Sequence, residues 1–364
     1  MNKGRDCSPQ MTHTMRSRLA RLVPALLTAS VSLLIAGCTH IGPPSVPRDR
    51  FDYNGEIARS WKEQILLNIV KTRYLDVPVF LDVTQIVSGY SLERTVSLGA
   101  TAVRSDVIDN VSAGVQGVYT DRPTITYTPL TGAEFNRNML TPIPPAAVLF
   151  TMASGWPVDL VFRVAVRSIN GIDSGADAPR YDRALVLLRA LQQAQVLGMR
   201  VQPEMKEGPA VVLFFRAREL TPEQTAMLRE VRDLLGIEPG QGEFTVVYGQ
   251  APTQPGEFAM LTRSMLQILI DLGLYVDVPE TDLREGRVAP GMTLATAGTG
   301  QLRIMHSRER PADALALVPY RGGWFFVDDR DLESKRTFAL TLLFSTLTET
   351  GARESLPLVT IPAG

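Results

Sequence analysis

Cysteine is scarce in this sequence: the chain of 364 residues has two, Cys7 and Cys38. A disulfide-rich scaffold is therefore excluded, and the length allows a large core without disulfides or a structural metal. No compositional bias is present either, because 45% of the residues are hydrophobic and 21% are charged, with 28 glycines and 25 prolines. This composition excludes a disordered or collagen-like protein and predicts a folded one of about two domains.

Sequence motifs of several enzyme classes are also missing. The chain has no G-x-S-x-G elbow, no Walker-type phosphate loop, no G-x-G-x-x-G after a strand and no H-E-x-x-H. Beyond residue 37 the only histidines are His40 and His306, which do not suit a histidine-rich metal site or a Ser-His-Asp triad. Nucleotide enzymes and zinc hydrolases are disfavoured, no cofactor is expected, and His306, in or near a strand, is expected to be structural.

The N-terminal segment carries the strongest signal. An apolar run from Leu22 to Ala36 follows three arginines within residues 16–21. The run is shorter than the about 20 apolar residues of a membrane-spanning helix, and it ends in small residues, as secretory signal peptides do. Residues 1–37 are therefore predicted to be a signal peptide. The long segment before the arginines leaves Met1, Met11 and Met15 open as the start of translation.

The apolar run ends in Leu34-Ile35-Ala36-Gly37-Cys38, which resembles the lipobox of bacterial lipoproteins. The resemblance implies cleavage between Gly37 and Cys38 and acylation of both the Cys38 thiol and the new N-terminus. Several acyl chains on one residue give a stable membrane anchor, whereas a single chain binds only marginally. An ordinary signal peptide with an incidental cysteine is the alternative.

The residue after the cysteine is Thr39. Enterobacterial lipoproteins are kept in the inner membrane mainly by Asp at this place, so the resemblance implies the outer membrane, with the body in the periplasm. Cleavage would leave 327 residues with one cysteine and no intramolecular disulfide. Five basic residues and one acidic residue are removed, leaving 32 basic and 37 acidic residues and a net charge of −5. Without a Lys/Arg-rich run, no nucleic-acid partner is expected.

Hydrophobic patterns predict an α+β fold. Residues 38–50, with three prolines, read as an extended tether. Residues 51–198 are predicted to be an N-terminal α+β domain with a helix over 54–73, an antiparallel hairpin and a helical middle. The helix is predicted from apolar residues recurring every four positions: Ile57, Trp61, Ile65 and Ile69. Residues 199–364 are predicted to be a C-terminal α+β domain of mixed α/β modules.

The hairpin over residues 91–120 is the most unusual stretch of the chain. Apolar residues alternate with polar ones on both sides of a polar turn at 105–110, and tyrosines lie near the ends. A hairpin that crosses a membrane has the same pattern. Half-buried strands of soluble proteins also alternate, and the small residues give weak hydrophobicity, so we favour the soluble hairpin.

The C-terminal domain carries several local signals. Thr221 and Gln224 are spaced as a capping box that starts a helix, and Gly236 is expected to end it. Gly322 and Gly323 are expected to supply positive φ angles in a tight hairpin. The remaining predicted elements are central strands at 210–215 and 244–248, a buried helix at 337–348 and an edge strand at 356–361.

An acidic group lies between a predicted strand and the last helix. It contains Asp328, Asp329, Asp331 and Glu333, which are weak candidates for a hard cation or for acid–base chemistry. Arg330 stands where an EF-hand loop needs an oxygen ligand, and the required glycine is missing. We favour the alternative that these carboxylates stabilise the start of the helix by its dipole and its first amides.

Three stretches resemble recurrent blocks of an uncharacterised family of proteobacterial lipoproteins: residues 60–70, 123–130 and 324–335. The resemblance spans most of the chain beyond the signal peptide. It implies a lipoprotein but carries no activity and no binding residues.

The sequence therefore predicts an outer-membrane-anchored periplasmic lipoprotein, a non-enzymatic envelope component that contacts other proteins. One alternative is a subunit of an oligomeric pore that uses the 91–120 hairpin in a shared barrel, resembling the curli secretion channel. Others are an enzyme acting on cell-wall or sugar substrates through the Asp328–Glu333 carboxylates, and a lipoprotein that binds a small ligand in a pocket between the two α+β parts. A homo-oligomer is left open.

Overall fold

The computed structural model describes residues 46–87, 90–102, 108–121, 124–202, 210–216, 219–238, 240–291 and 302–348. The predicted signal peptide 1–37, Cys38, the tether up to residue 45 and the strand at 356–361 lie outside the described residues. The chain divides after Trp61, and residues 62–364 form one compact unit. The described residues form helices, antiparallel sheets and one mixed sheet, so the fold is α+β, as predicted.

Helix α2 (Val46–Arg73) is the first described element. It begins inside the segment predicted as an extended tether, so residues 46–50 are helical instead. Pro47 is tolerated there because the first turn of a helix has N–H groups without intrahelical partners. From residue 62 onward, the apolar side chains that α2 buries are Ile65, Leu66, Ile69 and Val70. Trp61, which the spacing places on the buried face, is 40% exposed.

A six-stranded sheet organises the unit from residue 62. Its strands lie in the order β6-β5-β10-β9-β8-β7. Neighbours are antiparallel except for the parallel pair β9 and β10. The strands are β5 (Val166–Ile169), β6 (Ile172–Asp173), β7 (Leu197–Gln202), β8 (Ala210–Phe215), β9 (Glu243–Tyr248) and β10 (Glu257–Thr262). The domain boundary predicted after residue 198 falls within β7, and the sheet joins strands from both predicted domains.

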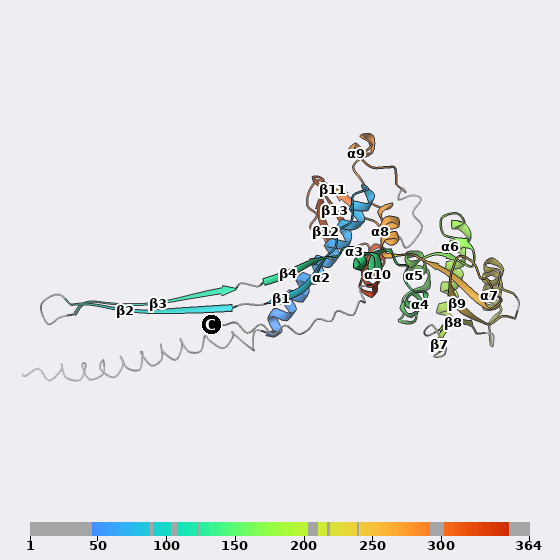
Figure 1. Cartoon of the computed structure of the whole chain (residues 1–364), viewed down its shortest axis with the longest axis horizontal. Coiled ribbons are helices and arrows are strands. Elements are labelled where there is room, and N and C mark those ends of the chain that lie inside the picture. Colours follow the sequence, from blue (N-terminus) through green and yellow to red (C-terminus); the bar gives the residue numbers. More distant parts are fainter. Residues whose placement is uncertain are drawn as a thin grey trace, which may run out of the picture. The chain divides into compact units, whose positions relative to one another are not determined.

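Four helices accompany this sheet: α4 (Pro145–Ala153), α5 (Val158–Ala165), α6 (Ala178–Gln193) and α7 (Pro222–Leu235). α4 packs on β8, β9 and β10, while α6 lies beside α7 (Figure 1). The predicted capping box of α7 is confirmed, because the Gln224 amide donates to the Thr221 hydroxyl (3.2 Å) and the Thr221 amide to the Gln224 side chain (3.0 Å). Gly236 ends α7 with φ at +64°, as predicted.

A three-stranded sheet in the order β11-β13-β12 follows in the chain. Its strands are β11 (Met305–Ser307), β12 (Ala314–Tyr320) and β13 (Gly323–Asp328). Two helices precede the sheet in the chain, α8 (Met265–Gly273) and α9 (Glu280–Arg284), and α10 (Leu332–Thr348) follows it. The β12–β13 hairpin is confirmed, but its positive φ angles lie at Arg321 (+47°) and Gly322 (+79°), one residue earlier than expected. Gly323 is needed for another reason: a Cβ atom there would collide with the His306 imidazole.

Residues 81–129 contain four strands that pair in two antiparallel ladders. β1 (Leu81–Val87) pairs with β4 (Thr124–Pro129), and β2 (Tyr90–Ala102) pairs with β3 (Ile108–Asp121). β4, which comes directly after the hairpin in the chain, pairs with β1 and does not extend the β2–β3 ladder. A short helix α3 (Gly132–Phe135) and a π-helical turn (Asn136–Leu140) come next. One cluster of buried apolar side chains links α2, the six-stranded sheet and α10.

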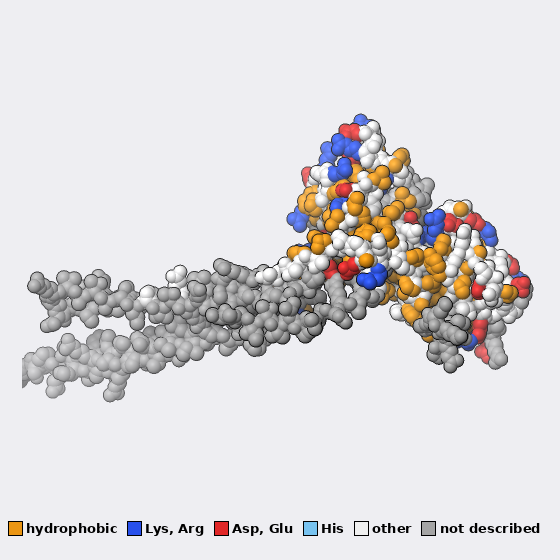
Figure 2. Space-filling view, viewed as in Figure 1, with side chains coloured by type: hydrophobic (Ala, Val, Ile, Leu, Met, Phe, Trp, Pro, Cys, Tyr) orange, Lys and Arg blue, Asp and Glu red, His pale blue; other side chains and the backbone are white. Residues whose placement is uncertain are grey.

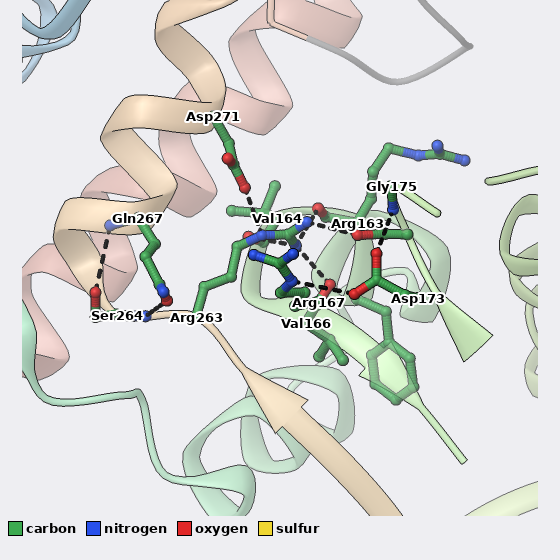
Figure 3. A network of polar contacts seen from close by, with 12 residues as sticks. Arg163, Val164, Val166, Arg167, Asp173, Gly175, Arg263, Ser264, Gln267 and Asp271 are labelled. Atoms are coloured by element: carbon green, nitrogen blue, oxygen red, sulfur yellow. Dashed lines mark hydrogen bonds and ion pairs between the residues drawn. The ribbon is translucent and has the colours of Figure 1, made fainter. Parts of the chain in front are cut away.

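Arg263 holds the end of α5 in place (Figure 3). The residue follows β10 and is 9% exposed. Its guanidinium donates to the carbonyl oxygens of Arg163 (3.1 Å), Val164 and Val166, and its Nε lies 2.6 Å from an Asp271 carboxylate oxygen of α8. A cation at a helix C-terminus satisfies carbonyl groups that have no partner in the helix and complements the helix dipole. Arg263 therefore ties α5, β5, β10 and α8 together.

Replacing Arg263 with Ala is expected to lower the free energy of unfolding by about 3–5 kcal/mol, because buried carbonyl groups lose their donor. Urea-induced unfolding measures the change. The matched control is Arg200→Ala, which removes an exposed pair with Glu243 (2.9 Å) and should cost at most about 1 kcal/mol. Equal losses in the two variants would contradict the assigned role of Arg263.

Candidate functional site

The acidic residues before α10 each have their own structural partner. The Asp328 carboxylate accepts a hydrogen bond from the Arg330 amide (2.8 Å), which closes a turn. The Asp331 carboxylate accepts from the Ser334 amide (3.2 Å) and hydroxyl (2.8 Å), so Asp331 is the N-cap of α10. The Lys335 ammonium lies 2.7 Å from the Asp329 carboxylate.

This arrangement supports the helix-start interpretation of the acidic group. Within the described residues, no three His, Cys, Asp or Glu side chains are placed so that they could hold a metal ion. Burial alone raises the pKa of the Asp331 carboxyl, but hydrogen bonds from Ser334 outweigh burial and hold that pKa below its usual value. A carboxylate held ionised in this way suits a helix cap and is a poor proton donor near neutral pH.

Asp331→Ala is expected to lower the free energy of unfolding by about 0.5–2 kcal/mol, the cost of a lost N-cap. Because the pKa of Asp331 is lowered in the folded chain, its ionised form stabilises the fold fully above about pH 5, and this contribution is lost as the pH falls through the lowered pKa. The difference in the free energy of unfolding between the native chain and the variant should therefore become smaller in acid, as measured by urea unfolding at several pH values.

The control for this experiment is Asp329→Ala, since Asp329 forms an ion pair of which both side chains are substantially exposed. This variant should differ from the native chain by no more than about 0.5 kcal/mol. A loss as large as that of Asp331→Ala, or a loss in Asp331→Ala that does not change with pH, would refute the capping role.

A surface depression of about 360 Å³ lies near the start of α5. It is lined by the 154–157 loop and by Leu160, Arg189 and Arg336. Arg189 is already engaged, since its guanidinium donates to the Gln192 side chain (2.8 Å) and lies 3.6 Å from the Asp159 carboxylate. The predicted ligand pocket between two α+β parts does not match this depression, which lies among α4, α5, α6 and α10.

The strands of residues 81–129, which we call the arm, form the remaining candidate for a functional site. At the base of the arm, every residue of β4 is exposed, and the apolar side chains of Leu81, Ile125 and Tyr127 are 43%, 40% and 54% exposed. Figure 2 shows that elsewhere on the same face of the described surface, acidic and basic side chains are interspersed with apolar ones. The arm base thus exposes large apolar groups on a narrow two-stranded ribbon.

The outer part of the arm is a long, regular ladder (Figure 1). β2 pairs with β3 in one continuous register from Tyr90↔Asp121 to Thr101↔Asn110, and the register shifts only before Ala102. The predicted 91–120 hairpin is therefore confirmed as a paired hairpin. Three alternate register pairs join apolar residues, and the pairs between and beside them join polar residues or glycines. The apolar pairs are Val96↔Val115, Leu98↔Ala113 and Ala100↔Val111.

Neither ladder gains a third strand within the described residues. β1 and β4 form a two-stranded sheet, and so do β2 and β3. Each of the four strands therefore has one edge whose outward N–H and C=O groups meet no other described strand. This pairing in twos was not visible in the sequence, because alternation shows the two faces of a strand but not how many neighbours the strand has.

The three sequence blocks that resemble a lipoprotein family map to α2, to β4 and to the segment from β13 into α10. Comparisons of the chain with protein-family models, with curated proteins and with solved structures give no match. The family resemblance stays a prediction. Among the described helices, none is both long enough and apolar enough to cross a membrane.

Proposed function

We propose that this chain is a non-enzymatic component of the bacterial envelope, held at the outer membrane by lipid on Cys38, which contacts other proteins through the arm. The observation that supports this proposal best is the exposure of the arm base, where every residue of β4 and the Leu81 side chain of β1 are exposed. In the acidic group before α10, which the sequence offered as a weak candidate for catalysis, Asp331 caps the helix, Asp328 closes a turn and Asp329 pairs with Lys335.

Physical chemistry explains why the arm needs a partner. A two-stranded hairpin by itself is marginally stable in water, because few of its side chains can be buried. Exposed apolar side chains such as Leu81 and Ile125 lose contact with water favourably when another surface covers them, at about 25 cal/mol per Å². The arm is thus built for contact with another surface.

The proposal of a lipid anchor is supported by the sequence. A positively charged segment, an apolar run and Ala36-Gly37-Cys38 occur in the order of a lipoprotein signal. Acylation would hold the chain stably at a membrane surface while its folded body stays in water. The arm would then meet partners that share the same surface, which raises their effective concentration.

Replacing Cys38 with Ser is expected to abolish incorporation of radiolabelled palmitate and to move the protein from the membrane fraction to the soluble or unprocessed fraction. The control is Cys7→Ser, because Cys7 lies in the predicted signal peptide and should not affect labelling. Palmitate labelling that survives in Cys38→Ser, or is lost in Cys7→Ser, would contradict the anchor.

Removing the outer arm tests the contact role. Val87 of β1 and Thr124 of β4 are register partners, so residues 88–123 can be replaced by Asn-Gly, which favours a two-residue hairpin turn. The variant should keep the thermal unfolding midpoint of the native chain, because the described core cluster includes side chains of α2, the six-stranded sheet and α10, all of which the replacement leaves in place. It should lose the complexes that chemical cross-linking captures in cells with the full chain.

Two outcomes of the excision experiment would contradict the proposal. Complexes that persist at the native level in a folded variant would show that the outer arm is not the contact surface. A lower unfolding midpoint would show that the arm belongs to the folded core, which the proposal denies.

A further inference from the structure

We infer that the surface depression at the start of α5 binds a small amphipathic anion: arginine side chains hold its carboxylate or phosphate group, and its apolar remainder packs against Trp156. The inference concerns the body of the chain and does not depend on the contact role of the arm. The volume of the depression, about 360 Å³, lies at the lower end of the range for small-molecule sites.

The lining of the depression divides into an apolar part and a charged part. Trp156, Pro157 and Leu160 form the apolar part, and the charged part consists of Arg189 and Arg336. Among the described residues that line the depression, none is acidic. Guanidinium groups donate paired hydrogen bonds to carboxylate and phosphate oxygens, and an indole ring packs well against a flat apolar group. The lining is therefore complementary to a ligand that joins a negative group to an apolar body.

Gln192 of α6 fixes the loop that supplies the apolar part. Its side-chain nitrogen donates to the Trp156 carbonyl oxygen (3.0 Å). Its side-chain oxygen accepts from the Val158 amide (3.0 Å) and from the Arg189 guanidinium (2.8 Å). Trp156 also packs against the core cluster. One side chain thus positions the apolar wall and one of the two arginines, so a ligand has little to order when it binds.

Both arginines keep hydrogen-bond donors for a ligand. Within the described residues, Arg189 uses Nη1 for Gln192, and its Nε lies 3.6 Å from the Asp159 carboxylate, so its Nη2 group is left for another acceptor. The Arg336 side chain is exposed on α10 and has no ion-pair partner in the described part of the chain. Asp159 offsets part of the charge of Arg189, whereas the charge of Arg336 is not offset. A bound anion therefore depends most on Arg336.

The test follows the Trp156 side chain by fluorine NMR. The chain has three tryptophans, so labelling with fluorotryptophan gives three signals, and Trp156→Phe identifies the relevant one. The processed full chain in a non-ionic detergent is titrated with phenyl phosphate and with benzoate, which share an aromatic ring and differ in the anionic group. Inorganic phosphate and benzyl alcohol serve as probes that each lack one half of this chemistry.

At least one of the two ring-bearing anions should shift the Trp156 signal and leave the signals of Trp61 and Trp324 in place. The anion that binds more tightly identifies the charged group that the site prefers. Inorganic phosphate and benzyl alcohol should bind at least about tenfold more weakly, because each makes only one of the two kinds of contact.

Variants of the exposed arginine test the charged part. Arg336→Gln should raise the dissociation constant of the tighter anion about tenfold, because charge-assisted hydrogen bonds are lost. Arg336→Lys keeps the charge but not the planar fork, so its affinity should lie between those of Arg336→Gln and the native chain. The matched control is Arg229→Gln on α7, an exposed arginine outside the depression, which should bind as the native chain does. Unchanged thermal unfolding midpoints confirm that the variants fold.

Three results would overturn the anion site. The first is a Trp156 signal that no probe shifts. The second is binding of benzyl alcohol or inorganic phosphate as tightly as the ring-bearing anions. The third is an unchanged affinity in Arg336→Gln, or an equal loss in Arg229→Gln, which indicates a general effect of surface charge. The contact role of the arm is tested separately, by the excision of residues 88–123.

Discussion

The buried guanidinium of Arg263 allows helix α5 to pass directly into strand β5. Ala165 is the last residue of the helix and Val166 the first of the strand, so no exposed loop is available where water could bind the last carbonyl groups. Arg263 donates to three of these carbonyls, and the buried Tyr181 hydroxyl reaches the Val166 oxygen at 2.9 Å. Burial raises the pKa of Tyr181, so the hydroxyl stays protonated and remains a donor. Because Arg263 directly follows β10, the same side chain ties the start of β5 to the end of its partner strand β10.

The base of the arm differs from the body in the exposure of its apolar side chains. In the body, buried polar groups such as those around Arg263 find donors from distant parts of the chain, and apolar side chains lie in one buried cluster. In the arm, the apolar side chains of Leu81, Ile125 and Tyr127 at the base are exposed. Exposed apolar side chains are those that a contact with another molecule can cover, which is why the arm rather than the acidic group is the functional candidate.

Local signals in the sequence predicted local structure well. The Thr221 capping box, the Gly236 helix end and the 91–120 hairpin depend on residues a few positions apart, and all three are confirmed. The sequence did not show the pairing of β5 with β10, because that contact joins segments about 90 residues apart. The role of Arg263 could not be predicted from the sequence for the same reason, because its carbonyl acceptors lie far away in the chain and only the fold brings them close. The start of α2 was missed because prolines favour both tethers and first helical turns.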